Sequence, residues 1–353
     1  MTEASSSQPR LITPTRLRIA ISMGDPGGIG PEVVVKALAR PSVRDLASFR
    51  IYGLDSCLCA AAARAGLTPF WKVVDRHDET SWPRDEVSVA SWPEALGEQH
   101  APAATRRGGQ LSFEFVQEAI SHAALGTDHS AGVEAVVTAP ICKESWSLAG
   151  FGKYPGHTEL FAERFHADRA AMLFHVPAID NHAVLNVILA TVHVPLLSLA
   201  RELTQQRIID AIELGAAACR RLGVAAPRIA VCGLNPHAGE HGLLGTEEGT
   251  LIEPAIRACV SRGLTVTGPH PGDTIFNAAF AGRFDLVVAM YHDQGLIPVK
   301  LIARDRAVNV TVGLPIVRTS PDHGTAFDIA GKNLADPGSM AAAIELAVRL
   351  CGA

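Results

Sequence analysis

Short apolar runs alternate along this chain with longer segments of helical pattern. Continuous apolar strands separated by helices are typical of parallel sheets that are buried on both faces. The strand candidates are 18–23, 49–54, 134–140, 184–191, 228–235, 264–269 and 285–291. The helix candidates are 31–40, 55–65, 108–125, 158–166, 204–222, 248–262 and 338–351. The alternation predicts an α/β protein with mainly parallel sheets.

The length of 353 residues is more than a single core usually supports, so we expect two domains. Residues 1–17 are polar and lack the apolar core of a signal peptide, which predicts a mobile tail. Residues 75–89 are the most polar later interval and predict a surface connection.

Composition excludes several classes of function. A net charge of −5 gives no basic footprint for nucleic acid or for an anionic membrane. The most apolar long stretch, 183–200, is interrupted by polar residues and a proline, which argues against a membrane span. Seven scattered cysteines without a C-x-x-C pair indicate a reducing cytoplasm. A small anionic substrate stays compatible, because its site needs only a few local cations.

Glycines, prolines and ionisable residues follow strand after strand. The strand-end segments read "MGDPGGIGPE", "TAPICKE", "ATVHVPL", "GLNPHAGEHG", "GPHPGDT" and "YHDQG". In open α/β sheets the carboxyl ends of the strands form the ligand crevice. A purely structural protein has no reason to concentrate such residues there, so the pattern indicates an enzyme.

Three histidines, His193, His237 and His292, come just after three of the predicted strands. Imidazole binds Zn²⁺, Co²⁺ or Mn²⁺ well, and strand ends bring distant residues together. Taken singly, each histidine is better explained as a hydrogen-bonded loop residue. The three equivalent positions favour a divalent metal site, although no H-E-x-x-H spacing accompanies them.

The segment "GDPGGIGPE" at 24–32 follows the first predicted strand. It lacks the dinucleotide fingerprint, because Pro31 and Glu32 follow Gly30 and no third glycine comes. Pro31 suits the first position of a helix. A tight strand-to-helix turn and a loop that contacts a ligand both stay open.

Several polar residues indicate an anion site. His157 and Thr158 lie at the expected start of a helix, where free N–H groups attract negative charge, although Thr158 also suits a helix cap. Lys300, Asn309 and Arg318 each lie within an apolar segment. A buried Lys or Arg needs an anionic partner, so the two cations favour a phosphate or carboxylate ligand. An internal ion pair to Asp or Glu is the alternative.

Proton transfer has three candidates, Asp293 beside His292, Asp273 in "GDT" and Lys143 in "TAPICKE". Carboxylates at such positions orient ligands or move protons. Lys143 equally suits a general acid, a substrate clamp or a surface lysine.

Together these motifs resemble the 4-hydroxythreonine-4-phosphate dehydrogenase family, which has the isocitrate/isopropylmalate dehydrogenase-like fold. The resemblance runs in matching order from about residue 18 to the end and includes "PGHTE", "TVHVPL", "GLNPHAGEHGLLGTEE", "NVTVGLPIVRTS" and "DHGTAFDIAGK". The last motif also resembles the loop of isopropylmalate dehydrogenases that holds the adenosine of NAD.

The resemblance implies a first α/β domain of residues 18–145 plus 320–353 and a second of 146–319, with the active site in the cleft between them. It also implies a homodimer that completes each site across the interface, and Gly295 is expected to leave the backbone open for substrate. The implied ligands of one divalent metal (Zn, Mg, Mn or Co) are His193, His237 and His292. The implied substrate residues are His157, Thr158, Lys300, Asn309 and Arg318. The implied residues for NAD or NADP are Asp322, His323 and Gly324.

The implied reaction is oxidation of a secondary alcohol by hydride transfer to NAD(P)⁺, followed by loss of the neighbouring carboxylate as CO₂. The expected substrate is a small phosphorylated hydroxy acid such as 4-hydroxythreonine 4-phosphate or 4-phospho-threonate, because "GHTE" and the three downstream residues are kept. Cys142 departs from the His or Asn common in members that serve pyridoxine biosynthesis. A terephthalate dihydrodiol dehydrogenase is the first alternative, since the same cations can bind a carboxylate. A non-catalytic ligand-binding paralogue is the second.

Overall fold

The computed structural model describes residues 16–76, 82, 86–95, 97–303 and 305–352. Most of the tail expected at 1–17 lies outside these residues. Within the described part of the chain, no helix combines the length and the apolar character that crossing a bilayer requires.

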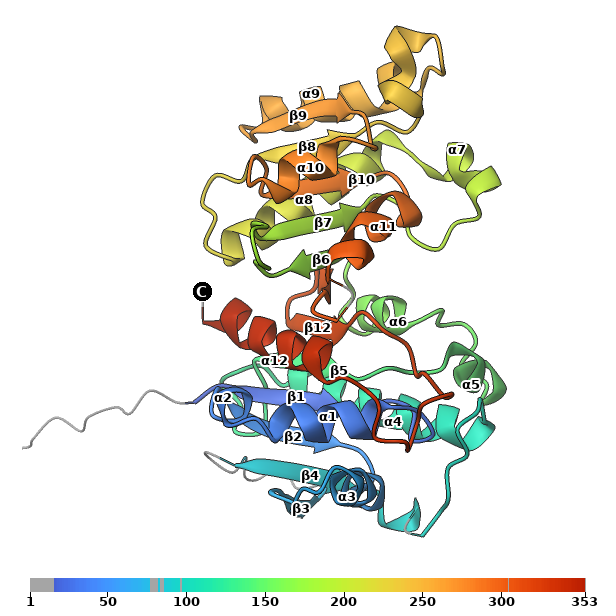
Figure 1. Ribbon diagram of the computed structural model, residues 1–353, viewed down its shortest axis with the longest axis vertical. Helices are drawn as coiled ribbons and strands as arrows, with labels where there is room; N and C mark the ends of the chain where they lie inside the picture. Colours follow the sequence, from blue (N-terminus) through green and yellow to red (C-terminus); the bar gives the residue numbers. More distant parts are fainter. Residues whose placement is uncertain (1–15, 77–81, 83–85, 96, 304, 353) are drawn as a thin grey trace, which may run out of the picture.

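One sheet runs through the whole length of the molecule (Figure 1). Its strands lie in the order β3-β4-β2-β1-β5-β12-β11-β6-β7-β10-β8-β9. In chain order they are β1 (Arg18–Ser22), β2 (Ser48–Tyr52), β3 (Lys72–Asp75), β4 (Val87–Ser91), β5 (Ala135–Thr138), β6 (Ala171–Val176), β7 (Leu185–Leu189), β8 (Ile229–Cys232), β9 (Val266–His270), β10 (Leu286–Ala289), β11 (Val308–Val312) and β12 (Val317–Pro321).

Both ends of the sheet are parallel, and only the central pairs β12–β11, β11–β6 and β6–β7 are antiparallel. The predicted α/β architecture with mainly parallel pairing is therefore confirmed. Strand pairing continues from β5 through β12 to β11 without a break. The division into two domains stays a prediction.

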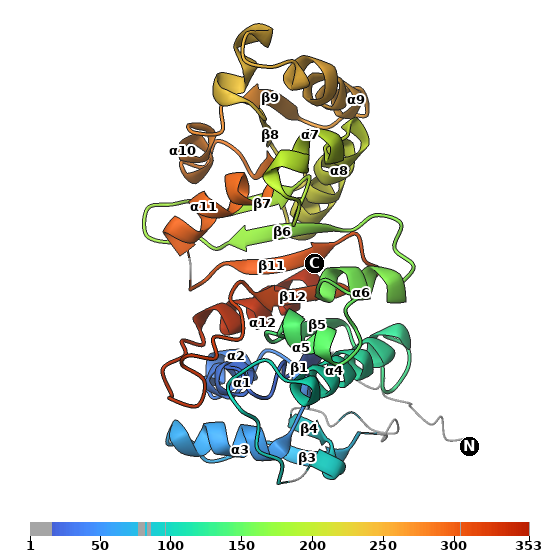
Figure 2. The same cartoon turned by 90° about the vertical axis from the view of Figure 1, so that its right-hand side faces the viewer.

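Helices cover both faces of this sheet (Figure 2). β7 shows the cause, because Leu185, Val187 and Leu189 contribute to one apolar cluster and Ile188 to the other. The α-helices are α1 (Gly30–Leu38), α2 (Pro41–Arg44), α3 (Asp55–Arg64), α4 (Arg106–Ala124), α5 (Lys143–Leu148), α6 (His157–Arg164), α7 (Leu199–Glu202), α8 (Gln205–Arg221), α9 (Glu253–Ser261), α10 (Ile275–Phe280), α11 (His292–Ala303) and α12 (Gly338–Cys351). Shorter helical turns are η1 (Pro93–Ala95), η2 (Leu196–Ser198), η3 (Pro236–Gly242) and η4 (Glu248–Ile252).

Every predicted strand and helix corresponds to an observed element, but the sheet is larger than predicted. The additional strands are β3, β4, β6, β11 and β12. The prediction of a surface connection at 75–89 is wrong at its end, because β4 pairs with β2 on one side and β3 on the other. Its polar residue Ser88 is buried and donates a hydrogen bond to the Phe49 carbonyl at 3.4 Å. A serine that bonds to the backbone in this way suits a central strand.

Candidate functional site

A cavity of about 380 Å³ lies near the middle of the sheet, where β5 and β12 end side by side. We call it the central cavity. The segment that follows β5, the start of α6 and the segment that follows β12 line it. The predicted site residues in its lining are Lys143, His157, Thr158, His193, His292, Lys300, Asn309, Arg318, Asp322, His323 and Gly324.

Arg318 is the most deeply buried cation of this cavity, with 2% of its surface exposed. Its guanidinium donates to Thr138 Oγ1 at 2.5 Å and to Thr311 Oγ1 at 3.0 Å, and its Nε has no partner. Burial lowers its pKa to about 9, which still leaves it cationic at neutral pH. No described carboxylate forms an ion pair with it, so the internal ion pair considered for Arg318 is wrong. Its charge is available to an anionic ligand.

His157 and Thr158 begin α6, as the sequence predicted. The N-cap is Gly156 and no side chain caps the helix, so Thr158 is not the cap; its hydroxyl lies 3.4 Å from Thr311 Oγ1. Burial, and then the charges of Arg318 and Lys143, hold the pKa of His157 well below its ordinary value. His157 is therefore a neutral imidazole that faces two cations, and its buried Nε2 has no hydrogen-bond partner.

Lys300 is more exposed than its apolar neighbours suggested, with 46% of its side chain accessible. Its Nζ lies 3.5 Å from Asp322 Oδ2, so for Lys300 the internal ion pair is what the structure contains. Burial raises the pKa of Asp322, and the Lys300 charge opposes that rise. The pair lines the central cavity from α11 and from the end of β12.

The central cavity collects buried polar atoms that have no hydrogen-bond partner. Such atoms are rare in folded proteins, because leaving a buried donor or acceptor unpaired is costly. Their concentration around one cavity therefore indicates a polar ligand. They are His157 Nε2, Asn309 Oδ1, Arg318 Nε and His323 Nε2.

His193 and His292 lie next to each other, because they follow the neighbouring parallel strands β7 and β10. Their ring centroids are 5.7 Å apart. The two strand ends are tied by Thr191, whose hydroxyl donates to the Met290 carbonyl at 2.7 Å. Burial, and then the charges of Lys143 and His292, lower the pKa of His193, which favours the neutral form that metals require.

Asp293 supports His292 from outside the central cavity. Its Oδ1 lies 2.7 Å from His292 Nδ1, while its side chain is 72% exposed. A carboxylate on one ring nitrogen fixes the tautomer and leaves the other nitrogen for a metal. Asp293 is thus placed to orient the ring of His292.

His237 lies apart from the other two histidines. With Asp273 and Asp293 it lines a different cavity of about 700 Å³, which we call the distal cavity. After β8 the chain enters the turn η3, in which His237 has a left-handed backbone. Within the described part of one chain, no group of three His, Cys, Asp or Glu residues suits a metal ion. The three histidines therefore do not meet in a single chain.

Gly295 has a packing role. A Cβ at this position would lie 2.7 Å from Leu189 Cδ2 and 3.0 Å from Val187 Cγ1. The glycine lets α11 pack closely on β7. The expectation that it leaves backbone room for substrate is wrong.

Thr138 and Thr311 belong to the site, although the sequence did not single them out. Both bind the Arg318 guanidinium, and Thr311 stands directly opposite Arg318 in the β11–β12 ladder. Threonine is common in strands, so its presence alone carries no functional signal. Only the position of β12 between β5 and β11 brings both threonines to Arg318.

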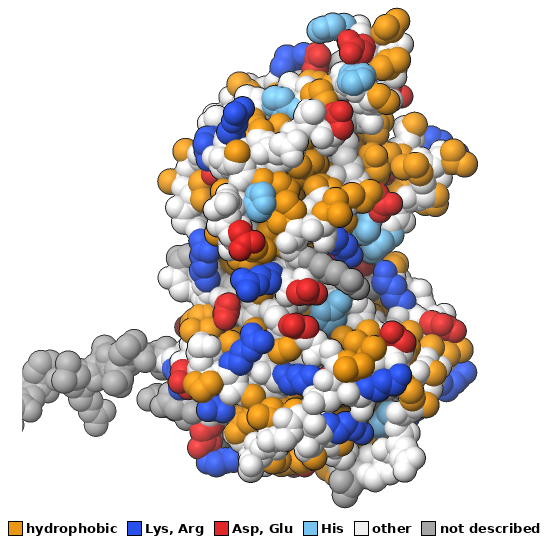
Figure 3. Space-filling view, viewed as in Figure 1, with side chains coloured by type: hydrophobic (Ala, Val, Ile, Leu, Met, Phe, Trp, Pro, Cys, Tyr) orange, Lys and Arg blue, Asp and Glu red, His pale blue; other side chains and the backbone are white. Residues whose placement is uncertain are grey.

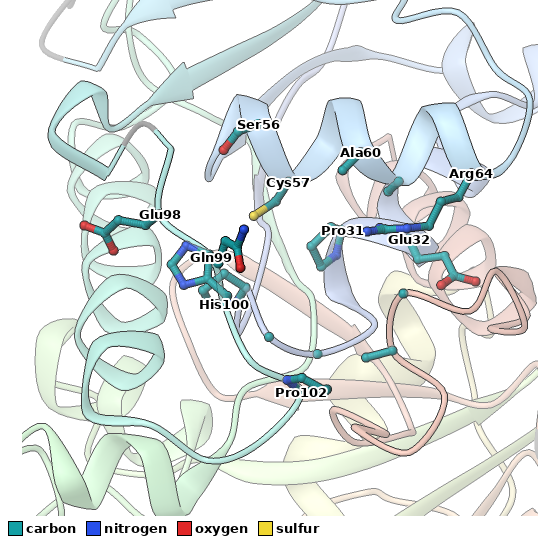
Figure 4. Close-up of a pocket in the computed structure, with 16 residues that line it drawn as sticks. Pro31, Glu32, Ser56, Cys57, Ala60, Arg64, Glu98, Gln99, His100 and Pro102 are labelled. Atoms are coloured by element: carbon teal, nitrogen blue, oxygen red, sulfur yellow. The ribbon is translucent and has the colours of Figure 1, made fainter.

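The glycine-rich segment forms a tight turn and also borders a third cavity, of about 510 Å³. A Cβ at Gly30 would lie 2.1 Å from the Met23 carbonyl, which supports the strand-to-helix turn. Figure 4 shows this glycine-turn cavity between α3, which carries Ser56 and Cys57, and the segment of Gln99 and His100. Both readings of "GDPGGIGPE" are thus compatible with its position.

The loop 322–331 connects the two cavities. Residues 322–324 line the central cavity, and residues 330–331 line the glycine-turn cavity. Between them, the Thr325 carbonyl accepts a hydrogen bond from Ile29 N at 2.9 Å, and a Cβ at Gly28 would lie 3.0 Å from Thr325. The loop therefore packs on the glycine turn and contributes to the lining of both cavities.

The sequence matches a protein family over most of its length. The family model "Pyridoxal phosphate biosynthetic protein PdxA" matches residues 47–347. The chain is 41% identical over 333 residues to 4-hydroxythreonine-4-phosphate dehydrogenase of Beijerinckia indica. This alignment covers 94% of each of the two chains. It is also 41% identical over 335 residues to D-threonate 4-phosphate dehydrogenase of Salmonella typhimurium. That alignment covers 94% of this chain and 98% of the relative.

Solved structures give the same relationship. 4-hydroxythreonine-4-phosphate dehydrogenase of Klebsiella pneumoniae superimposes with a TM-score of 0.79 at 39% identity, over 95% of this chain and 99% of that one. A terephthalate 1,2-cis-dihydrodiol dehydrogenase of Burkholderia xenovorans LB400 gives a TM-score of 0.63 at 28% identity, over 94% and 98% of the two chains. The phosphate-substrate dehydrogenases are thus the more similar of these relatives in both sequence and structure.

Proposed function

The chain belongs to the PdxA family, and we propose that it is a nicotinamide-dependent dehydrogenase that oxidises the secondary alcohol of a small phosphorylated hydroxy acid. One observation carries the phosphate part of this proposal. Arg318 is buried and cationic, bonds only to hydroxyl groups among the described residues, and adjoins the start of α6. The substrate class follows the names of both relatives.

The phosphate binds at the end of the central cavity formed by Arg318, His157 and Thr158. A phosphate neutralises the guanidinium and accepts hydrogen bonds, including one from neutral His157. The N-terminus of α6 adds free N–H groups and positive potential. Asn309 on β11 and Lys300 on α11 complete the set of residues proposed to bind the phosphate.

The alcohol to be oxidised binds beside His193 and His292. A divalent metal held by these imidazoles would polarise the hydroxyl and stabilise negative charge on its oxygen. Two adjacent imidazoles with a carboxylate behind His292 suit such a metal, but they form an incomplete set. His237 of the partner subunit supplies the missing nitrogen in this proposal.

Lys143 is the candidate for proton transfer. Of the three residues considered from sequence, it alone lines the central cavity. Its charge lowers the pKa values of both His157 and His193, so it lies near the phosphate end and the metal end. As a cation, Lys143 can stabilise negative charge on the substrate oxygen and act as a general acid, and we assign to it proton donation to the enolate left after loss of CO₂.

The dinucleotide lies along loop 322–331 in this proposal. When bound, a nicotinamide cofactor would supply the acceptor for the hydride of the alcohol carbon. The orphaned Nε2 of His323 and the two cavities at either end of the loop support this course. A substrate whose carboxylate is β to the new ketone can then lose CO₂, and the proposal includes this step.

A second copy of the chain is the expected partner. Figure 3 shows hydrophobic side chains gathered over the half of the molecule that carries α7, α10 and α11. Ile297 and Leu301 on α11 are 57% and 80% exposed, and Leu197 of η2 is 98% exposed. Such a patch next to the distal cavity suits a protein interface.

The substrate assignment is tested by NADH or NADPH formation with added metal. The substrates to compare are 4-hydroxythreonine 4-phosphate, D-threonate 4-phosphate and a terephthalate cis-dihydrodiol. Turnover of a phosphorylated acid supports the proposal. Turnover of the diol alone would mean that Arg318 binds a carboxylate, as in the alternative, and no turnover of any kind would favour a ligand-binding paralogue.

The shared site is tested by subunit complementation. His193→Ala and His237→Ala are each expected to be inactive as homodimers. In a mixed dimer one site receives both substitutions and the other receives neither, so co-expression should restore about a quarter of wild-type activity. Failure to restore activity in a verified mixed dimer would show that His237 does not act across the interface.

A further inference from the structure

The turn that carries His237 has an uncommon backbone. Five consecutive residues, 237–241, have φ between 44° and 79°. Only Gly239 among them adopts this left-handed conformation freely, because a Cβ is crowded there. Runs of this kind persist only where the surroundings fix them, and they are frequent at functional sites.

Glu248 is the group that fixes this turn. It is 5% exposed, and its Oε1 accepts hydrogen bonds from Leu234 N at 2.8 Å and Asn235 N at 2.7 Å. Its Oε2 accepts a third from Asn235 Nδ2 at 2.9 Å. Hydrogen bonds to a buried carboxylate are stronger than those between neutral groups. Glu248 thus holds both residues that lead into Pro236 and the turn.

The turn also rests directly on this carboxylate. A Cβ at Gly239 would lie 2.6 Å from Glu248 Oε2, so only glycine allows the contact. Gly239 and Glu248 are buried, whereas His237, Glu240 and His241 are exposed. The buried side of the turn is therefore anchored and its outer side presents His237 to a neighbour.

We propose that Glu248 is a positioning residue for metal binding, which holds the left-handed turn so that His237 can complete a metal site in the partner subunit. The inference rests on the proposed function, because it takes His237 as a metal ligand. Without the carboxylate, the turn relaxes toward a right-handed or extended backbone and His237 points elsewhere. The central cavity and its substrate residues in the same chain keep their structure.

The test is the affinity of the full-length dimer for Mn²⁺ or Zn²⁺ alone, measured by titration calorimetry. Glu248→Gln should weaken metal binding about 10- to 100-fold, the range typical for residues that orient metal ligands. Glu253→Gln is the matched control, because Glu253 follows on the same segment but is exposed and pairs with Arg257. It should bind metal like the wild type.

A rescue variant separates positioning from general stabilisation. Glu240 has φ of 44°, so Glu240→Gly relieves strain in the turn without touching the carboxylate. Added to Glu248→Gln, it should recover part of the lost metal affinity. A variant that loses affinity only because the fold is weakened should not be rescued at this exposed position.

Gly239→Ala covers the case in which Glu248→Gln fails to fold. It displaces the turn from the carboxylate and should reduce metal affinity to a similar extent. Wild-type affinity in either folded variant would overturn the role of Glu248. Wild-type affinity in His237→Ala would instead overturn the proposed metal site, so the two failures can be told apart.

Discussion

The central cavity and the distal cavity differ in the side chains that line them. The central cavity is lined by polar side chains, several with buried atoms that have no partner, and it holds a buried cation without an anion. The distal cavity is lined largely by apolar side chains such as Phe276, Phe280 and Leu301. The first is built for a small charged ligand, and we interpret the second as a surface for another protein chain. His237 of the distal cavity therefore has surroundings unlike those of His193 and His292 in the central cavity.

The largest effect on activity is expected from a substitution at the phosphate end of the central cavity. Arg318→Met should lower kcat/KM for a phosphorylated substrate about a hundredfold or more, mainly through KM, because a buried charged partner of the substrate is lost. Steady-state kinetics measure this. Arg207→Met, at an exposed ion pair with Glu202, is the control and should leave KM unchanged. An unaltered KM in Arg318→Met would place the phosphate elsewhere.

A smaller effect is expected at the boundary between the two cavities. Asp293 lines the distal cavity but hydrogen-bonds to His292 of the central one. Asp293→Asn should weaken metal affinity about tenfold, because the neutral amide that replaces the carboxylate fixes the His292 ring less firmly. Metal titration measures this, with the exposed Asp45→Asn as control. Equal affinities in the wild type and Asp293→Asn would assign Asp293 to the distal cavity alone.

The smallest effect concerns protons in the central cavity. Burial depresses the pKa of His157 in the folded protein, so the unfolded chain binds more protons below the ordinary value of about 6.5. Stability should therefore fall as the pH drops through that value, and it should fall less in His157→Asn. Melting temperatures of the metal-free proteins across this pH range measure the difference. In His157→Asn the decrease of stability with falling pH should persist in part, because the pKa values of His175, His193 and His323 are also lowered. Identical slopes would contradict the assigned burial of His157.

Much of the fold was predictable because most of its strands are continuous apolar runs in the sequence. Apolar runs such as 285–291 became β10, and every predicted strand is in the sheet. β4 was missed because its serines reduce its apolar character, although hydrogen bonding allows them to be buried. β11 and β12 were missed because polar residues interrupt them, and those residues, Asn309 and Arg318, belong to the candidate site.

The site was predictable in its residue types more than in its grouping. Strand order makes His193 and His292 neighbours, as the positions after β7 and β10 suggested. Gly295 was misread, because only the packing of α11 on β7 reveals why a side chain cannot fit. Thr311 was overlooked, because its role depends on its position opposite Arg318.

The sequence by itself determined the α/β class, the strand-end position of the chemistry and the residue types that can bind a metal, an anion and a proton. These follow from local patterns, since burial periodicity and turn residues act over a few positions. Only the tertiary structure decided which of these residues share a cavity. Strand order unites residues far apart in sequence, whereas His237, in a left-handed turn after β8, lines another cavity than the two histidines that the sequence grouped with it.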